Sequence, residues 1–179
     1  MTERLWFQNV VEGLFVRGLG PTLSATDKVA LANVGLKLDK LLPAYSEGVM
    51  LEALRIAGPL VLPRGNFEEQ QHELGVRMVK GYFDTLLGKA MVGVVKLVGP
   101  ERGISRLDRN LRTLTNYLNA RIVTRAERSA DVEVEPVGPL MHFIVGILHG
   151  SGSLDDDGKS GATLVSHSGE KCVMRLSWG

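Results

Sequence analysis

The spacing of the apolar residues changes near Thr115, and this change limits the chain to a fold of mixed class. Before Thr115 the apolar residues recur three or four positions apart, which is the spacing of one helix face. After it they alternate with polar residues, as in strands that bury one side. Helices that precede the strands, rather than alternate with them, indicate an α+β fold. We predict one domain, in which an N-terminal helical bundle (1–114) is followed by a four-stranded antiparallel sheet (115–179).

The composition agrees with a single globular domain and excludes several classes of protein. Of 179 residues, 44% are hydrophobic and 23% are charged, and the net charge is +1. This apolar content is too high, and the net charge too low, for a disordered chain. A general nucleic-acid-binding protein would carry a clear basic excess, so we expect no nucleic-acid partner. The single cysteine, Cys172, excludes an internal disulfide and a cysteine-rich zinc site.

Periodicity and capping residues predict a series of helices in the first part of the chain. Ser24 or Thr26, and then Asn66, are suited to begin helices, because their side chains accept hydrogen bonds from unpaired backbone amides. Gly58-Pro59 is expected to end a helix. The predicted helical ranges are 10–15, 24–35, 46–56, 67–98 (two helices, or one kinked near Gly88) and 102–114.

The second part is predicted to contain two hairpins with one helix inserted between them. Its predicted elements are strands at 118–123 and 131–135, a helix over 140–149, and strands at 162–167 and 171–178. The faces that we expect to be buried are Leu118, Ala120 and Ile122 in the first strand and Cys172, Met174, Leu176 and Trp178 in the last.

No segment of the sequence is typical of membrane insertion or export. The stretch 136–154 lacks Asp, Glu, Lys and Arg over 19 residues. Its apolar part is only about ten residues long, against the roughly 20 that a membrane span needs. Gln8, Asn9 and Glu12 interrupt the apolar residues near the N-terminus, where a signal peptide requires an unbroken run. We therefore expect a cytoplasmic protein with no membrane partner.

Two short motifs and one cysteine are candidates for phosphate binding, metal binding and catalysis, but none has the features that its function requires. Gly158-Lys159-Ser160 ends like a phosphate-binding loop, yet Ser153 stands where the first glycine is needed. The aspartates at 155–157 lack the alternate spacing and the closing glutamate of a calcium loop. Cys172 is placed on an apolar face, where a thiol stays protonated and inert. We therefore expect no enzymatic activity, no metal site and no cofactor.

One face of the predicted helix 102–114 carries a group of arginines. Arg102, Arg106 and Arg109 lie together on the helical wheel, opposite the apolar face. Guanidinium groups bind phosphate and carboxylate through paired hydrogen bonds, so this face is a candidate site for an anionic partner. Alternatively, the arginines pair with neighbouring carboxylates, such as Asp108 and those of the second strand, or simply face water.

Two histidines, His142 and His149, lie on one side of the predicted helix 140–149. They are seven residues apart, which corresponds to about 10.5 Å along a helix axis. This distance is too long for both rings to bind one metal ion. We interpret the two histidines either as the polar edge of a packed helix, or as the polar lining of a pocket or of a self-association face.

Motifs spread over nearly the whole chain carry a resemblance to a known family. They are Gly13-Leu14-Phe15-Val16-Arg17-Gly18-Leu19, Leu97-Val98-Gly99-Pro100-Glu101-Arg102, Arg106, Arg109, Asn116-Tyr117 and Leu176-Ser177-Trp178. The pattern resembles a large paralogous set of short proteins of unknown function, described mainly in myxobacteria. This resemblance implies no particular activity.

The order of the predicted elements is similar to that of a second, more distant group. This superfamily joins haem nitric-oxide-sensing domains, 4-vinyl-reductase-type sensor domains and small subunits of a vesicle-tethering complex, and residues 138–150 resemble its inserted helix. Its haem members ligate iron through a histidine on the helix before the first strand, but 103–114 contains none. Tyr117 and Arg121 resemble the tyrosine–arginine clamp for the haem propionates, although they lie on the first strand instead of after the second. The resemblance implies a scaffold that dimerises and binds small ligands or partner proteins, without haem.

These observations lead to two expectations about function. The first is a non-enzymatic, cytoplasmic, homodimeric module that binds a small apolar or anionic ligand and acts as a sensor or signalling unit. The alternative is an adaptor or scaffold that has no pocket and works through contacts with a protein partner. The candidate ligand- or partner-binding residues are Arg102, Arg106, Arg109, Tyr117, Arg121, His142 and His149.

Overall fold

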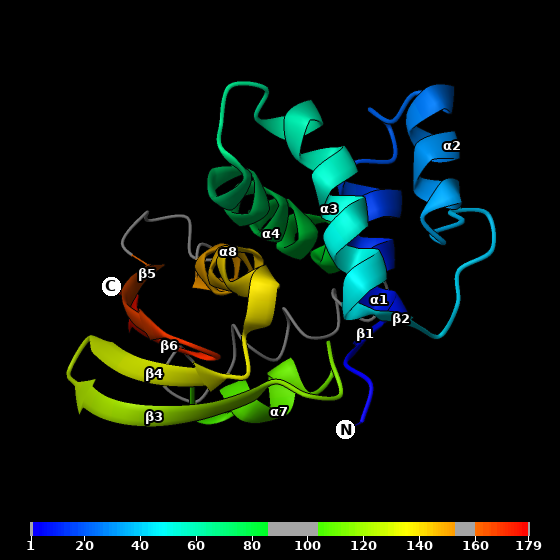
Figure 1. Cartoon of the computed structure of the whole chain (residues 1–179). Coiled ribbons are helices and arrows are strands. Elements are labelled where there is room, and N and C mark those ends of the chain that lie inside the picture. Colours follow the sequence, from blue (N-terminus) through cyan, green and yellow to red (C-terminus); the bar gives the residue numbers. More distant parts are fainter. Residues whose placement is uncertain (1, 86–103, 153–159, 179) are drawn as a thin grey trace.

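The computed structural model of the chain describes residues 2–85, 104–152 and 160–178 (Figure 1). The helical half contains β1 (Leu5–Phe7), α1 (Gln8–Val11), a π-helix (Glu12–Gly18), α2 (Ala25–Asn33), β2 (Ala44–Ser46), α3 (Glu47–Val61) and α4 (Phe67–Phe83). The second half contains α7 (Leu107–Leu111), β3 (Asn119–Ala126), β4 (Ser129–Glu135), a 3₁₀-helix (Gly138–Leu140), α8 (Met141–Gly152), β5 (Gly161–Ser168) and β6 (Lys171–Ser177).

The second half confirms the predicted α+β architecture. Its four strands form one antiparallel sheet in the order β3-β4-β6-β5, and α8 connects the two hairpins. Figure 1 shows α8 between this sheet and α4, and α8 contacts α4, β5 and β6. The buried face of the last strand is confirmed as well, since Cys172, Met174, Leu176 and Trp178 are all buried.

Two helix starts form as their capping residues predict. Asn66 accepts a hydrogen bond from the amide of Glu69 (3.0 Å), and the Glu69 carboxylate accepts one from the amide of Asn66 (2.9 Å). Ser24 and Asp27 make the same reciprocal pair at the start of α2. Each pair satisfies backbone donors that the first turn of a helix leaves without a partner.

The prediction that Gly58-Pro59 ends a helix is wrong, because α3 continues to Val61. Pro59 lies in the last turn, where its missing N–H removes one bond of the helix ladder, and the amide of Leu62 still donates to the carbonyl of Gly58 (3.0 Å). Gln70 of α4 packs against Gly58 and donates to the carbonyls of Leu62 and Gly65. The helix therefore ends at a cap supplied by its neighbour.

The first strand of the sheet follows the predicted alternation only at its beginning. Leu118 is buried and Ala120 is partly buried, but Ile122 is 37% exposed. β3 lies at the edge of the sheet, and its register shifts between Ile122 and Thr124. Because the bulge and the edge position leave the end of the strand uncovered, the prediction of a half-buried strand fails beyond Ala120.

A small two-stranded sheet in the helical half is absent from the sequence-based prediction. β1 and β2 pair antiparallel, with Trp6 opposite Tyr45, and Trp6 also bridges to Thr115. These strands have three residues each, which is too short for an alternating pattern to show. Their pairing fixes Trp6 in the core next to the start of the large sheet. Among the described residues, no helix combines the length and the apolar character that crossing a membrane requires.

Candidate functional site

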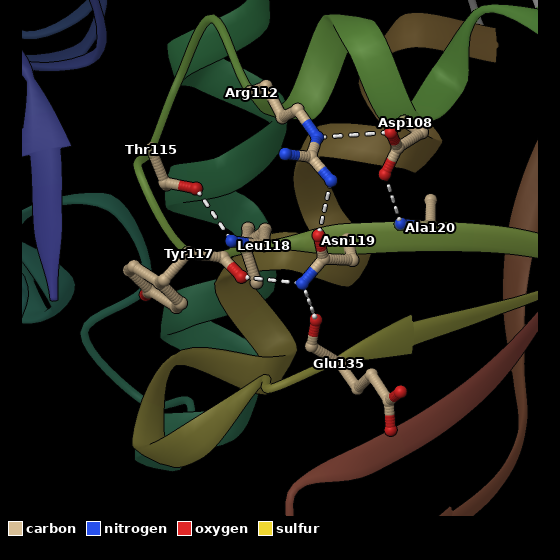
Figure 2. A network of polar contacts seen from close by, with 8 residues as sticks. All are labelled: Asp108, Arg112, Thr115, Tyr117, Leu118, Asn119, Ala120 and Glu135. Carbon is tan, nitrogen blue, oxygen red and sulfur yellow. Dashed lines mark hydrogen bonds and ion pairs between the residues drawn. The ribbon is translucent and has the colours of Figure 1, made fainter. Parts of the chain in front are cut away.

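The predicted arginine helix is interrupted at Arg106 and ends at Leu111, and a polar network joins it to the sheet (Figure 2). Within the described part of 102–114, residues 104 and 105 are helical, a turn at Arg106 interrupts the helix, and α7 (Leu107–Leu111) follows. The hydroxyl of Thr113 donates to the carbonyl of Asn110 (2.7 Å). Such a local bond competes with the helix ladder and ends it early.

Asp108 and Arg112 tie α7 to the sheet. One carboxylate oxygen of Asp108 accepts from the amide of Ala120 (2.9 Å), and the other accepts from Nε of Arg112 (3.0 Å). Arg112 also donates to the side chain of Asn119 (2.7 Å), as Figure 2 shows. The Ala120 amide, followed by Arg112, holds the pKa of Asp108 below its usual range. This arginine therefore has a structural role.

The structure describes three of the four arginines of the predicted site. Arg106 and Arg109 are exposed, and Arg102 lies outside the described residues. Arg121 projects from β3 and pairs with Glu133 of β4 at 2.7 Å, which is the alternative pairing with carboxylates of the second strand. Binding of an anion by Arg106 and Arg109 stays a prediction.

Tyr117 is partly buried and packs against the core. Its ring meets Trp6 edge to face, with 6.2 Å between ring centroids, and the Arg4 guanidinium stands 5.5 Å above it. Burial, followed by the nearby Glu47 carboxylate, holds the pKa of Tyr117 well above its usual range. Arg4 bridges Glu47 (3.5 Å) and Glu170 (3.0 Å), so it links α3 to the turn between β5 and β6.

His142 lines a surface groove of about 290 Å³ between α3, α4 and the start of α8, and His167 of β5 also contributes to its wall. Its Nε2 lies 3.4 Å from the Glu68 carboxylate. The groove also contains Arg55, whose guanidinium stands 4.6 Å above the ring of Phe67. Apolar groups of Leu51, Phe67, Pro139 and Met141 complete its wall. The interpretation of His142 as polar lining of a pocket agrees with this position.

Gln71 is a residue of this groove that the sequence did not single out. Its side chain is buried and spans two elements: Nε2 donates to the carbonyl of Pro139 (3.0 Å), and Oε1 accepts from the amide of Phe143 (3.2 Å). These two bonds hold the start of α8 against α4, and His142 lies between the two bonded residues. A buried glutamine must satisfy both ends of its amide, so the position requires this residue type.

His149 has a different partner from His142. Its Nδ1 lies 3.1 Å from Nε2 of His72 on α4, and the two ring centroids are 5.1 Å apart. Burial, followed by the proximity of His149, lowers the pKa of His72. The sequence assigned no role to His72, because its partner is 77 residues away along the chain.

Cys172 lies where the sequence predicts, on the buried face of β6. Burial raises the pKa of its thiol to about 11. Within residues 2–85, 104–152 and 160–178, no three His, Cys, Asp or Glu side chains gather as metal ligands. The phosphate-loop motif and the aspartates at 155–157 fall in or next to 153–159, outside the described residues.

The fold is similar to that of several solved H-NOX structures. An oxygen-binding H-NOX domain related to soluble guanylate cyclases shares 12% identity, with 95% of this chain and 93% of that chain covered, at a TM-score of 0.70. A structure on modulating heme redox potential through porphyrin distortion shares 12% identity over 96% and 100%, also at 0.70. A variant of an H-NOX protein from S. oneidensis shares 10% identity over 97% and 96%, at 0.66. At these identities the likeness shows the fold alone.

The residues of this chain do not fit the haem that this fold holds elsewhere. The helix before the first sheet strand, α7, contains no histidine, and the sequence has none between His72 and His142. Tyr117 is partly buried and packs against Trp6, whereas Arg121 turns to Glu133 on the surface of the sheet. The two side chains that would clamp the propionates are therefore committed to different neighbours.

The remaining comparisons concern the sequence itself. No curated protein matches it. The profile of one family matches residues 4–179, which is nearly the whole chain and includes the motifs at both ends. The chain therefore belongs to the family described as protein of unknown function (DUF2378).

Proposed function

We propose that the protein is a non-enzymatic, homodimeric sensory module that binds a small organic anion in the groove between α3, α4 and α8. The observation that carries the proposal is the groove itself, which combines an apolar wall with Arg55 and His142 in about 290 Å³. Ligand sites are typically concave and mostly apolar, with a few polar groups that fix orientation, and begin near 300 Å³. The groove approaches this size and has this composition.

The charges in the groove favour an anionic head group. Arg55 is half exposed, pairs loosely with Glu52 (3.5 Å), and lies over Phe67. His142 pairs with Glu68, whose side chain is 70% exposed and is free to turn into water. An incoming carboxylate or phosphate would take the place of Glu68 beside His142 and receive hydrogen bonds from Arg55. An aromatic or aliphatic body would then cover Phe67 and Met141.

The position of the groove supports a sensory role. Its wall includes Gln71 and Pro139, which join α4 to the start of α8. Because α8 also packs on β5 and β6, a ligand that changes the α4–α8 contact has a direct connection to the sheet. Cys172, the one thiol, is buried with a raised pKa and is unsuited to act as a nucleophile, in keeping with a non-enzymatic role.

The proposal is tested by calorimetric titration with benzoate and phenyl phosphate, using benzyl alcohol as the neutral control. We expect saturable binding of the anions only. Binding should weaken at least about tenfold, or 1.4 kcal/mol, in Arg55→Gln and in His142→Gln. Arg64→Gln changes an exposed arginine outside the groove and should bind as the wild type does. Equal affinity in all variants, or no binding of either anion, would overturn the proposal.

Native mass spectrometry of the untreated protein tests the remaining parts. A dimer that carries a small-molecule mass increment supports the sensory module. A dimer with nothing bound, together with failed titrations, favours the alternative of a protein-interaction adaptor. A monomer contradicts the homodimeric arrangement.

A further inference from the structure

The two histidines between α4 and α8 form a site that is separate from the groove. Nε2 of His72 and Nδ1 of His149 are 3.1 Å apart, within hydrogen-bond distance. In the metal-free pair, one ring must donate a proton to the other, because two neutral rings share one proton between these nitrogens. We propose that a divalent first-row transition-metal ion, Zn²⁺ or Cu²⁺, takes the place of this hydrogen bond and is held by both rings. The donor ring then carries its proton on its other nitrogen, so that both rings coordinate the ion as neutral imidazoles.

The distance between the nitrogens suits such an ion. Zn–N bonds to imidazole are about 2.0–2.1 Å, so two imidazole ligands of a tetrahedral ion stand about 3.3 Å apart. The observed 3.1 Å needs only a small side-chain movement to reach this value. Imidazole is a preferred ligand for zinc and copper, and copper binds such sites more tightly than zinc in the Irving–Williams order.

The backbone around the two rings is fixed by close helix packing. Gly146 of α8 stands against the carbonyl of His72, and Gly75 of α4 stands against the backbone of Phe143 and Ile147. A Cβ atom at either glycine would collide with these groups. His72 and His149 each lie three residues from one of these glycines. The two ligands therefore project from helices whose separation is set by direct backbone contact.

The ligand set indicates an exchangeable ion rather than a closed structural site. Among the described residues the pair supplies two imidazole nitrogens and no third His, Cys, Asp or Glu, which is fewer than the four protein ligands of a closed structural zinc site. Both rings are partly buried, not enclosed. Glu73, next to His72, pairs with Arg77 at 3.0 Å, and its negative charge lies close enough to His72 to act on it.

An ion bound at this site should stabilise the folded protein, whereas an ion bound nonspecifically at the surface should not. The two ligands are 77 residues apart in sequence and come together only in the folded chain. An ion held by both therefore binds the folded state in preference and raises the melting temperature. Zinc added to the untagged protein should raise the melting temperature in a saturable way, and a chelator should reverse the shift.

Single substitutions locate the ion. His72→Gln and His149→Gln should each lose the zinc-dependent shift and weaken zinc binding at least about tenfold. His142→Gln and His167→Gln, which change the other two histidines, should keep both. The same zinc affinity in all four variants, or no saturable binding by the wild type, would overturn the proposal.

A measurement on the wild type keeps the proposal testable if a variant fails to fold. One equivalent of Cu²⁺ should give an electron paramagnetic resonance spectrum with coupling to two imidazole nitrogens. Coupling to one nitrogen, or to none, would contradict a site shared by His72 and His149. The groove proposal does not depend on this result, because His142 and Arg55 take no part in the pair.

Discussion

Asp108 connects α7 to β3. The two elements are neighbours along the chain, but the sequence does not show that a side chain links them. From the sequence it is one of several carboxylates that might neutralise arginines, and its neighbour Arg112 lies at the edge of the predicted cationic face. In the structure both are used within the network that holds α7 to β3. Capping residues such as Asn66 were predictable, because their partners lie within one turn. The hydrogen bond that the Ala120 amide donates to Asp108, twelve residues earlier in the chain, was not predictable.

Substitution of Asp108 tests this role. We expect Asp108→Ala to lower the free energy of unfolding by about 1 kcal/mol at pH 7, since the Ala120 amide and Arg112 lose a charged acceptor at a partly exposed site. Asp108→Asn keeps an oxygen for the amide and should cost less. The folded pKa lies below the ordinary 3.8, so the contribution of the charge is complete above 3.8 and is lost as the pH falls through the folded value.

Urea unfolding between pH 7 and pH 3 gives the free energy of unfolding of the wild type and both variants. The difference in this free energy between the wild type and Asp108→Asn should become smaller at the acid end of the range. A gap that widens there would contradict the lowered pKa of Asp108.

Cys172 provides a second test on the scale of one residue. Its thiol is buried between the sheet and α8, and its pKa is raised to about 11. Two factors, inaccessibility and a low thiolate fraction, should therefore prevent reaction with a disulfide reagent at pH 8. We expect the folded protein to react only as fast as it unfolds, and the protein in strong denaturant to react at once. Stoichiometric modification of the folded protein at the rate of a free thiol would show that the register of β6 is wrong.

At the scale of elements, the sequence predicts what neighbouring residues determine, and misses what distant elements determine. Alternation placed Cys172 and Met174 inward correctly, because β6 is a central strand with neighbours on both sides. The same reasoning failed beyond Ala120, because β3 is an edge strand. Both edge strands shift register at a valine, Val123 and Val165, which are each 50% exposed. Such bulges protect sheet edges from further pairing, and a periodic pattern does not reveal them.

The candidate site shows the same limit between elements. The sequence correctly grouped His142 and His149 as polar residues of one helix, but each has its partner on α4, in Glu68 and His72 respectively. The contact between α4 and α8 brings these pairs together. Gly75 and Gly146 allow that contact, and neither glycine alone indicates which helix will approach it.

Gly146 and Gly48 provide a matched pair for testing the contact between α4 and α8. Gly146→Ala should lower the free energy of unfolding by about 1–3 kcal/mol. A Cβ atom there would meet the His72 backbone, and this penalty outweighs the gain of about 1 kcal/mol in helix propensity. Gly48 is also helical, but its Cβ atom would meet only Ser46 Oγ, at 3.9 Å. Gly48→Ala should therefore be neutral or stabilising by up to about 1 kcal/mol.

Urea unfolding curves with their slopes distinguish the two substitutions. A Gly146→Ala variant as stable as Gly48→Ala would show that the helices are not held as close as the structure indicates. In that case the distance between His72 and His149 would also be in doubt.

At the scale of the molecule, the chain shares the architecture of H-NOX domains and differs at the residues that matter for their cofactor. The TM-score of 0.70 extends over 95% of the chain, so the two folds are similar. The element that precedes β3 has the sequence Leu-Asp-Arg-Asn-Leu. Its Asp108, together with Arg112 directly after the helix, forms the junction with the sheet. In this chain, the helix before β3 therefore has a structural role, because it is bonded to the sheet.

This difference predicts the outcome of adding haem. We expect hemin titrated into the untagged protein to give no stoichiometric complex with the absorption spectrum of histidine-ligated iron, in either oxidation state. The four histidines lie on α4, α8 and β5, where His142 lines the groove and His72 is paired with His149. An apo H-NOX domain treated in the same way should take up haem and serves as the control. A one-to-one complex whose spectrum changes when one of the four histidines is replaced by glutamine would contradict the expectation. Such a complex would mean that a histidine outside α7 ligates the iron. The absence of a histidine from α7 would then not prevent haem binding.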